Sequence, residues 1–395
     1  MEDFEFISPT KIYFGKQKYL RIAEILKVYN KNNILIVIGQ HHIKSSGLLD
    51  KILNLLNKSN ISYLILDNIR PNPIKKDVIK GLDLIKNKNI DLILAIGGGS
   101  VIDTAKSISV NYYYDKDVFD FNLKKAIPTK SLPIGVILTI PASGSELSNS
   151  CVIQDDELKI KKGFNSDLVR PLFVIEDPTL TLSLPKYQTM CGIVDILMHT
   201  FERFLSKSSD EMLADYLAIG LLKNVIDNSL KLLKNPNDYD ARANIMLASS
   251  FSHNNLTNLG KNHNMPVHYL EHILSGIYPS VAHGAGLAVI FPQFLKEFFK
   301  QDYKKLAILN KYLFNSFIEN ERECGKFFIE NLQNYFKILG MPLSFADLGI
   351  TNCDINELAK QFVKNGTREI DHNGKMLNEE ISKNIFIRCL GGKNQ

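Results

Sequence analysis

The sequence contains few cysteines, and their spacing fits no cysteine framework. There are five, an odd number, and no two of them form a Cys-x-x-Cys pair; they are Cys151, Cys191, Cys324, Cys353 and Cys389. Disulfide frameworks and zinc knuckles need paired cysteines at short spacings, so this pattern argues against both.

Long apolar runs are also missing. No uncharged apolar run approaches the roughly 18 residues that a membrane-spanning helix requires. Glu2, Asp3 and Glu5 lie near the start, where a secretory signal peptide would have positive charge followed by an apolar stretch. From the sequence we therefore expect a soluble, cytoplasmic protein.

A strong excess of either charge is absent as well. The 47 Lys and Arg residues face 42 Asp and Glu residues, a net charge of +5, and 45% of the residues are hydrophobic. This composition excludes a disordered chain, and the interspersed signs provide no basic stripe for nucleic acid. With 395 residues the chain exceeds the roughly 250–300 beyond which cores divide, which predicts two domains.

The first half of the chain alternates between strand and helix patterns. Apolar, β-branched runs typical of buried strands cover residues 33–39, 61–66, 91–96 and 133–140. Apolar residues at helical spacing cover 48–56, 76–86 and 101–110. This alternation with short connections predicts a doubly wound, mostly parallel sheet, an α/β domain at residues 1–185.

From Pro185 onward the pattern is helical, and no strand pattern stands out. Apolar residues recur at three- and four-residue spacing in segments 187–205, 212–233, 241–256, 304–318 and 323–338. The prolines that separate such segments are Pro236, Pro266, Pro279, Pro292 and Pro342. We therefore expect an all-α domain at residues 186–395.

A glycine-rich turn, Gly97-Gly98-Gly99-Ser100, lies between a predicted strand and a predicted helix. Glycines leave backbone N–H groups unobstructed, and the positive end of the helix dipole points at the turn, a combination that binds phosphate. The alternative is a tight turn in which glycine only avoids strain. Asp103, one turn later, could contact a ribose hydroxyl or could simply favour the helix N-terminus.

Histidines are concentrated late in the chain. Asp195 and His199 are four residues apart on a predicted helix, so they share one face, and His268 and His272 repeat that spacing. His283 begins a glycine-containing turn into an apolar helix. Three imidazoles and one carboxylate suit Fe²⁺ or Zn²⁺, whereas any single histidine could be a hydrogen-bonded core or surface residue. We interpret the set as a metal site.

A different interpretation uses a shorter motif. His268, Glu271 and His272 match the H-x-x-E-H pattern of inverzincin metallopeptidases, in which both histidines bind zinc and the Glu is the general base. That alternative gives no role to the glycine turn or to the Asp195 and His199 pair.

Several blocks together resemble the iron-containing (group III) alcohol dehydrogenase family, in particular its NADPH-dependent butanol dehydrogenase branch. The resemblance extends from about Ser8 to Leu390, and its blocks are Ile96–Lys106, Thr139–Glu146, Arg170–Pro185, Gly192–Leu205 and His268–Pro292. It implies an N-terminal dinucleotide-binding α/β domain and a C-terminal helical metal- and substrate-binding domain, with the active site in the cleft between them.

The resemblance also implies roles for single residues. The metal ligands would be Asp195, His199, His268 and His283. His272 would lie near the nicotinamide and is a candidate proton relay. The cofactor contacts would come from Gly97, Gly98, Gly99 and Ser100 at the pyrophosphate, Thr139 and Ser143 along the cofactor, Lys161 near the nicotinamide ribose, and Thr179 and Leu180 on the adenine side.

The end of the predicted strand at Gly39 bears on the choice of dinucleotide. NAD-preferring relatives place an acid there to bond the ribose 2′-OH, whereas this chain continues Gln40-His41-His42. Without the carboxylate there is no repulsion of a 2′-phosphate, and His41, His42 or Lys44 could pair with one. We therefore expect NADP, with NAD as the alternative, and count Gly39 and Gln40 among the cofactor contacts.

Taken as a whole, the resemblance predicts a metal-dependent oxidoreductase that transfers a hydride between NAD(P)H and a short-chain aldehyde or primary alcohol. One divalent metal, Fe²⁺ or Zn²⁺, would polarise the substrate oxygen. A homodimer is expected, and no nucleic-acid or membrane partner. The alternatives are the zinc peptidase, a catalytically idle nucleotide-binding protein, and a dehydroquinate-type lyase that shares the fold.

Overall fold

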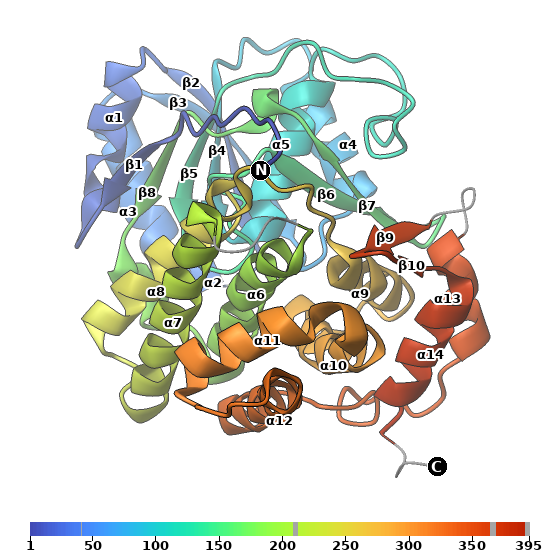
Figure 1. The fold of residues 1–395 in the computed structure, drawn as a ribbon. Coiled ribbons are helices and arrows are strands. Elements are labelled where there is room, and N and C mark those ends of the chain that lie inside the picture. The colour runs from blue at the N-terminus through green and yellow to red at the C-terminus, as the bar shows by residue number, and fades with distance from the viewer. Residues whose placement is uncertain (41, 208–211, 364–368, 392–395) are drawn as a thin grey trace. The chain divides into compact units, whose positions relative to one another are not determined.

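The computed structural model describes residues 1–40, 42–207, 212–363 and 369–391 (Figure 1). The chain forms two compact units. The first, here called the α/β unit, consists of Ile7–Leu184 and Ser249–Asn254; the second, the helical unit, consists of Met1–Phe6, Pro185–Ala248 and Asn255–Gln395. Two short segments thus depart from the order of the sequence. Met1–Phe6 belongs to the helical unit, and Ser249–Asn254 belongs to the α/β unit.

A six-stranded, entirely parallel sheet forms the centre of the α/β unit, as predicted. Its strand order is β1-β8-β5-β4-β2-β3. The bounds are β1 Lys11–Phe14, β2 Asn33–Gly39, β3 Ser62–Ile69, β4 Leu92–Gly97, β5 Ile134–Leu138 and β8 Phe173–Glu176. The antiparallel hairpin of β6 (Ser150–Asp155) and β7 (Ile160–Asn165), which the sequence reading did not predict, lies outside this sheet.

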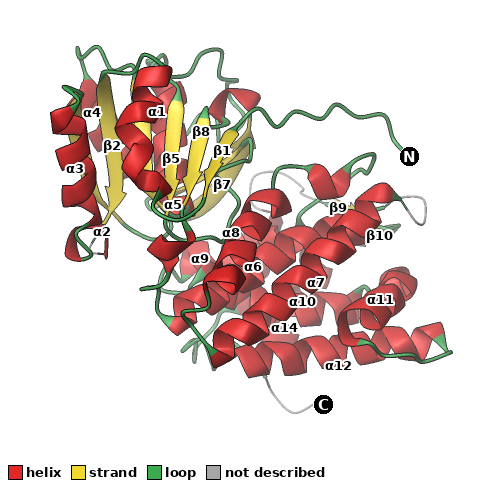
Figure 2. Cartoon of the chain, turned by 90° about the vertical axis from the view of Figure 1, so that its left-hand side faces the viewer, coloured by secondary structure: helices red, strands yellow, loops and turns green. Residues whose placement is uncertain are grey.

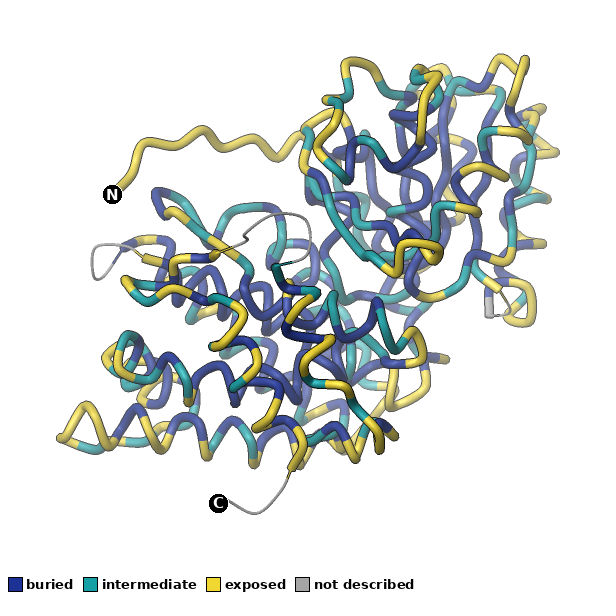
Figure 3. Tube along the Cα trace, turned by 90° about the vertical axis from the view of Figure 1, so that its right-hand side faces the viewer, coloured by how far each residue is buried: buried dark blue, intermediate teal, exposed yellow. Residues whose placement is uncertain are grey.

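Helices cover both faces of the sheet (Figure 2). They are α1 Ile22–Val28, α2 His42–Ser45, α3 Leu48–Lys58, α4 Lys75–Ile85 and α5 Gly99–Asn111. Because neither face of the central strands meets water, β4 and β5 are buried at every position, and their sequences are continuous apolar runs instead of alternating ones. Figure 3 shows buried chain in the interior of this unit and exposed chain at its surface.

The carboxyl ends of β2 and β4 define the ligand-binding edge of this sheet. After β2 the chain forms β3 on one side and then returns to form β4 on the other side of β2. In doubly wound folds, ligands bind at the carboxyl edge where the strand order reverses in this way. Gly39 ends β2 and Gly97 ends β4, so both predicted cofactor segments begin at this reversal.

The end of α8 (Tyr239–Ser252) belongs to the α/β unit because polar side chains anchor it there. Ser249 and Ser250 each bond the buried carboxyl of Glu146, at 3.0 and 2.9 Å, and Ser250 also lies 2.7 Å from the carboxyl of Glu176. One residue beyond the helix, His253 Nδ1 donates to the main-chain oxygen of Ser143 at 2.8 Å. This segment therefore supports the loop that follows β5.

The helical unit confirms the predicted helical C-terminal half. Besides most of α8, its helices are α6 Lys186–Leu205, α7 Leu213–Lys234, α9 Pro266–Ile277, α10 His283–Glu297, α11 Phe299–Phe314, α12 Glu321–Leu339, α13 Ile355–Val363 and α14 Glu379–Cys389. The fully buried Phe201, Phe291 and Phe328 belong to a large hydrophobic core of this unit. In the part of the chain that the structure describes, no helix is long and apolar enough to span a membrane.

Two features of the helical unit differ from the expectation. A short antiparallel hairpin, β9 (Ile370–His372) with β10 (Lys375–Leu377), interrupts the helices; three-residue strands give too short a pattern to be recognised. Pro292, expected between helices, lies inside α10.

Candidate functional site: metal centre and nucleotide pocket

The four predicted metal ligands come together within the helical unit. α6 provides Asp195 and His199, α9 provides His268, and α10 begins at His283. Asp195 Oδ1 lies 3.2 Å from His199 Nδ1, 3.5 Å from His268 Nε2 and 3.7 Å from His283 Nε2. Ligand atoms of Asp195, His199 and His268 all lie within 4.8 Å of one another. Three separate helices thus bring three imidazoles to one carboxylate.

Local sequence explains how the helices approach one another. A Cβ at Gly284 would lie 2.1 Å from the main-chain oxygen of Cys191 on α6, so only glycine lets the first turn of α10 come this close. A Cβ at Gly286 would lie 2.9 Å from Glu271 Cγ on α9. The glycines after His283 therefore serve close helix packing, which positions the imidazole beside Asp195.

Two buried glutamates orient the histidines. Glu202 Oε2 pairs with His268 Nδ1, and its other oxygen accepts the N–H of Val267 at 2.6 Å. Glu271 Oε2 pairs with His283 Nδ1. Each carboxylate pairs with Nδ1 of its histidine, so that Nε2 of the same ring faces Asp195. This arrangement fixes the orientation of metal-binding imidazoles in proteins. The sequence reading missed Glu202 and gave Glu271 a role only in the peptidase alternative.

The chemistry of these donors fits a divalent cation. Asp195 Oδ1 and His268 Nε2 are buried, and neither has a hydrogen-bond partner among the residues that the structure describes. Burial would raise the pKa of the Asp195 carboxyl, but the charges of His199 and His283 outweigh it and lower the pKa well below its usual value. A buried carboxylate oxygen and a buried ring nitrogen without partners would be costly, and a metal cation satisfies both.

The surroundings give the other imidazoles different proton affinities. Burial lowers the pKa of His199 to about 4, against the opposing charge of Asp195, so this ring is neutral and able to ligate near pH 7. Burial also acts on His268, but the charge of Glu202 and the contacts with Asp195 raise its pKa to about 9. A metal ion would have to displace that proton, as metals generally do at protein ligands.

His272 lies beside these residues but outside the main cluster. Its ring centroid is 5.4 Å from that of His283 and 6.4 Å from that of His268. With Glu271 and His283 it forms a second group of donor atoms within 4.8 Å of one another. Because Glu271 is fully buried and paired with His283, its carboxyl is not placed as the general base that the peptidase interpretation requires.

The glycine turn lies where a phosphate site needs it. β4 ends at Gly97, and α5 begins at Gly99 with Gly98 as an N-cap that offers no side-chain hydrogen bond. The turn is also tightly packed, since a Cβ at Gly99 would lie 2.4 Å from Ser143 Oγ and one at Gly98 would lie 2.9 Å from Ile140 Cβ. The packing supports the steric interpretation of the glycines. The helix N-terminus without a side-chain cap is compatible with the phosphate interpretation, which stays a prediction.

Asp103 has a structural role in this unit. Its two carboxyl oxygens accept hydrogen bonds from Ser145 Oγ at 2.6 Å and from the N–H of Val152 at 3.0 Å. Burial raises its pKa. The side chain thus ties α5 to the loop after β5 and to β6, and the ribose contact stays a prediction. Lys161, on β7, donates to Asn72 Oδ1 at 2.9 Å.

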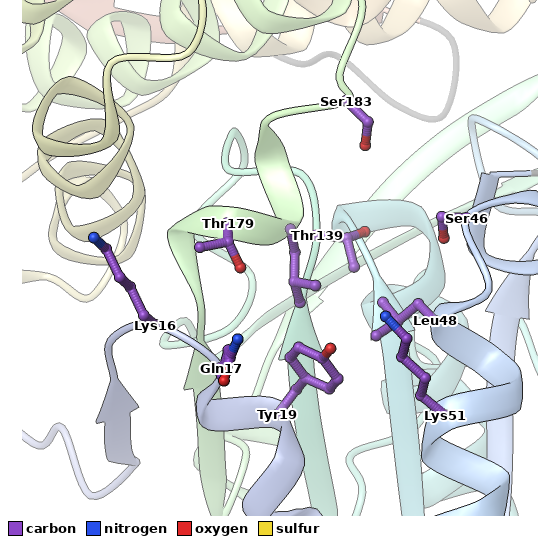
Figure 4. Close-up of a pocket in the computed structure, with 10 residues that line it drawn as sticks. Lys16, Gln17, Tyr19, Ser46, Leu48, Lys51, Thr139, Thr179 and Ser183 are labelled. Atoms are coloured by element: carbon purple, nitrogen blue, oxygen red, sulfur yellow. The ribbon is translucent and has the colours of Figure 1, made fainter.

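A cavity of about 320 Å³ opens within the α/β unit (Figure 4). Its lining includes Thr139, Thr179 and Leu180, three residues predicted to contact the cofactor. Thr179 is itself fixed, because its N–H and hydroxyl bond Asp177 Oδ1 at 3.0 and 2.6 Å. The sequence reading missed the other lining residues, Lys16, Gln17, Tyr19, Ser46, Leu48, Lys51 and Ser183.

The segment after β2 differs from the expectation in one respect. Gly39 ends β2, and Gln40 follows it as an exposed residue. His41 lies outside the described residues. Lys44, one of the three residues that could pair with a 2′-phosphate, forms an ion pair with Asp67 on β3.

Comparison with known proteins agrees with this geometry. A family model described as iron-containing alcohol dehydrogenase matches residues 9–178, and one for the C-terminal part of the Fe-containing family matches residues 189–386. NADH-dependent butanol dehydrogenase A of Clostridium acetobutylicum is 37% identical over 92% of this chain and 94% of its own length. The NADPH-dependent aldehyde reductase YqhD of Escherichia coli is 30% identical over 98% and 99%.

A solved structure shows the same likeness. The crystal structure of an NADH-dependent butanol dehydrogenase A from Thermotoga maritima superposes with a TM-score of 0.94 at 30% identity, covering 99% of both chains. With both family models, these relatives and the predicted blocks in agreement, the chain belongs to the iron-containing alcohol dehydrogenase family and is an NAD(P)-dependent oxidoreductase.

Proposed function

We propose that this protein interconverts short-chain aldehydes and primary alcohols by hydride transfer with NAD(P)H, using one divalent metal held by the helical unit. The observation that carries the proposal is the cluster in which Asp195 Oδ1, buried and without a hydrogen-bond partner among the described residues, lies within 3.7 Å of nitrogens from three histidines. Relatives named as butanol dehydrogenase and aldehyde reductase support the substrate class.

Each residue of the centre has a distinct task in this proposal. Asp195, His199, His268 and His283 would hold Fe²⁺ or Zn²⁺, which supplies Lewis-acid polarisation of a substrate oxygen when bound. Glu202 and Glu271 orient two of the imidazoles through Nδ1, which keeps their Nε2 lone pairs available. His272, adjacent to His283 but outside the main cluster, is suited to carry a proton to or from the substrate oxygen.

The α/β unit would hold the dinucleotide. The uncapped N-terminus of α5 at Gly98 and Gly99 offers N–H groups to the pyrophosphate, with Gly97, Ser100 and Ser143 beside it. Thr179 and Leu180 would enclose the adenine side, and Thr139 would line the cofactor beside them. Lys161 would lie near the nicotinamide ribose. No acidic residue follows β2 at Gly39 and Gln40, so NADPH is the dinucleotide we propose. A homodimer and a cytoplasmic location remain predictions from the sequence.

The test is an absorbance assay at 340 nm with NADPH and NADH in parallel and butanal as substrate. Activity should disappear after chelation and return with Fe²⁺ or Zn²⁺. Asp195→Asn should lose both bound metal and turnover, while Asp227→Asn, which changes an exposed aspartate elsewhere in the helical unit, should retain both. An Asp195→Asn protein with normal metal content and turnover would refute the ligand assignment.

A further inference from the structure

The charged residues that line the cavity in the α/β unit are all basic. Of its ten lining residues only Lys16 and Lys51 are charged, and none is acidic. The remainder are hydroxyl, amide and apolar side chains, including Tyr19, Ser46 and Leu48. A wall with cations and no carboxylate favours an anionic group on whatever occupies the cavity.

Helical geometry directs Lys51 to this cavity. Leu48 and Lys51 are three residues apart in the first turn of α3, so they share one helix face. Leu48 is buried and lines the cavity, and Figure 4 shows the ammonium of Lys51 extended beside it. Among the described residues, no carboxylate forms an ion pair with Lys51, so its charge is not already neutralised.

Lys44 provides the contrast. It is seven residues earlier, in α2, and its ammonium is paired with Asp67 on β3. It does not line the cavity. A phosphate that used Lys44 would have to break this pair, whereas one that used Lys51 would not.

The position of the lysine indicates which anion it serves. Thr179 and Leu180, which would enclose adenine in the proposed function, line the same cavity as Lys51 and Ser46. Ser46 and Lys51 come from the connection after β2, the strand end at which doubly wound folds distinguish a ribose 2′-hydroxyl from a 2′-phosphate. The anion adjacent to adenine at that point of a dinucleotide is the 2′-phosphate.

We propose that Lys51, assisted by the hydroxyl of Ser46, is the residue that selects NADPH over NADH in this protein. The proposal rests on the proposed function for the identity of the ligand. Lys51 contributes its ammonium, and Ser46 a hydroxyl that in this structure donates to the main-chain oxygen of Ile43 at 3.3 Å and would turn to the phosphate. Hydrogen bonds from a cation to a phosphate are among the stronger ones in proteins. NADH has no 2′-phosphate, so the ammonium of Lys51 has no anionic partner on it and adds little to its binding free energy.

The experiment measures binding of 2′,5′-ADP and 5′-AMP by titration calorimetry, with no metal or aldehyde present. The wild-type protein should bind 2′,5′-ADP at least about tenfold more tightly. Lys51→Gln should reduce this ratio by about tenfold or more, since the loss of one charge-assisted contact amounts to that. Lys58→Gln, the same change at the exposed far end of α3, and Lys44→Gln should leave the ratio unchanged.

Three results would overturn the proposal: a Lys51→Gln protein with the wild-type ratio, a Lys44→Gln protein that loses it, or a wild-type protein that binds neither nucleotide. Circular dichroism of each variant checks that it is folded. These titrations need neither metal nor turnover, so they test Lys51 separately from the proposed function. A protein that discriminates between the two nucleotides but is inactive towards aldehydes would refute the proposed substrate class and not the role of Lys51.

Discussion

The carboxyl of Glu176 should give the α/β unit a pH dependence of stability that one substitution removes. Ser250 Oγ lies 2.7 Å from Glu176 Oε1 and 2.9 Å from Glu146 Oε1. A hydroxyl has one proton, so it can donate to only one of them, and the other carboxyl must be protonated to donate to Ser250. Burial also raises the pKa of Glu146, but Glu146 accepts a second hydroxyl, Ser249 Oγ, at 3.0 Å. We therefore assign the proton to Glu176, whose pKa burial and the charge of Glu146 raise to about 8.

The magnitude follows from proton linkage. In the unfolded chain Glu176 has its ordinary pKa of 4.5, and in the folded protein its pKa is about 8. Between these values the folded state holds a proton that the unfolded state releases, so stability falls as pH rises. The full shift of 8 − 4.5 corresponds to about 5 kcal/mol, of which about 3 kcal/mol is lost between pH 5.5 and pH 8.

Glu176→Gln tests this reasoning. Glutamine keeps the shape and can donate to Ser250, but it does not titrate. The loss of unfolding free energy between pH 5.5 and pH 8 should therefore be about 3 kcal/mol smaller than in the wild type, measured by urea unfolding followed by circular dichroism. The control is Glu157→Gln, at an exposed position, which should keep the wild-type pH slope. A Glu176→Gln protein with that same slope would show that the carboxyl is ionised throughout.

Two further predictions concern the metal centre and the glycine turn. Glu202→Gln should weaken the orientation of His268 and lower the metal affinity roughly 10- to 100-fold, measured by titration against a competing chelator, and an unchanged affinity would contradict the role given to Glu202. Gly99→Ala would place a Cβ 2.4 Å from Ser143 Oγ. The substitution should cost about 1–3 kcal/mol of stability, measured by thermal melting, and should weaken NADPH binding, measured by fluorescence titration. A Gly99→Ala protein with wild-type stability and NADPH affinity would show that the turn has room for a Cβ.

The parallel sheet could be predicted because its central strands carry the strongest sequence signal. β2, β4 and β5 are buried on both faces, so their apolar runs are unbroken. β1 and β8 have only four residues each, too few for a reliable pattern, and their place in the sheet depends on pairing between segments about 160 residues apart. Such long-range pairing has no local sequence signal.

At the metal centre, helical spacing indicated the ligands but not their partners. Asp195 and His199 share a face of α6, and Glu202, three residues after His199, lies near the same face. A carboxylate on the buried side of an apolar helix needs a partner, so that residue could have been found from the sequence. Glu271 was noticed only within a five-residue motif, and its pairing with His283 depends on how α9 packs against α10.

On the nucleotide side, nearness in sequence and helix periodicity point to different lysines. Lys44 was considered for its short distance from the end of β2, and its ammonium forms an ion pair with Asp67 on the neighbouring strand. Lys51 lies farther along the chain, yet it shares a helix face with the buried Leu48. A residue one helical turn from a buried leucine at a cavity wall is directed to that cavity by the helix itself. In that proposal the residue that meets the ligand is set by which face of α3 packs on the sheet, and that depends on the apolar pattern of the whole helix.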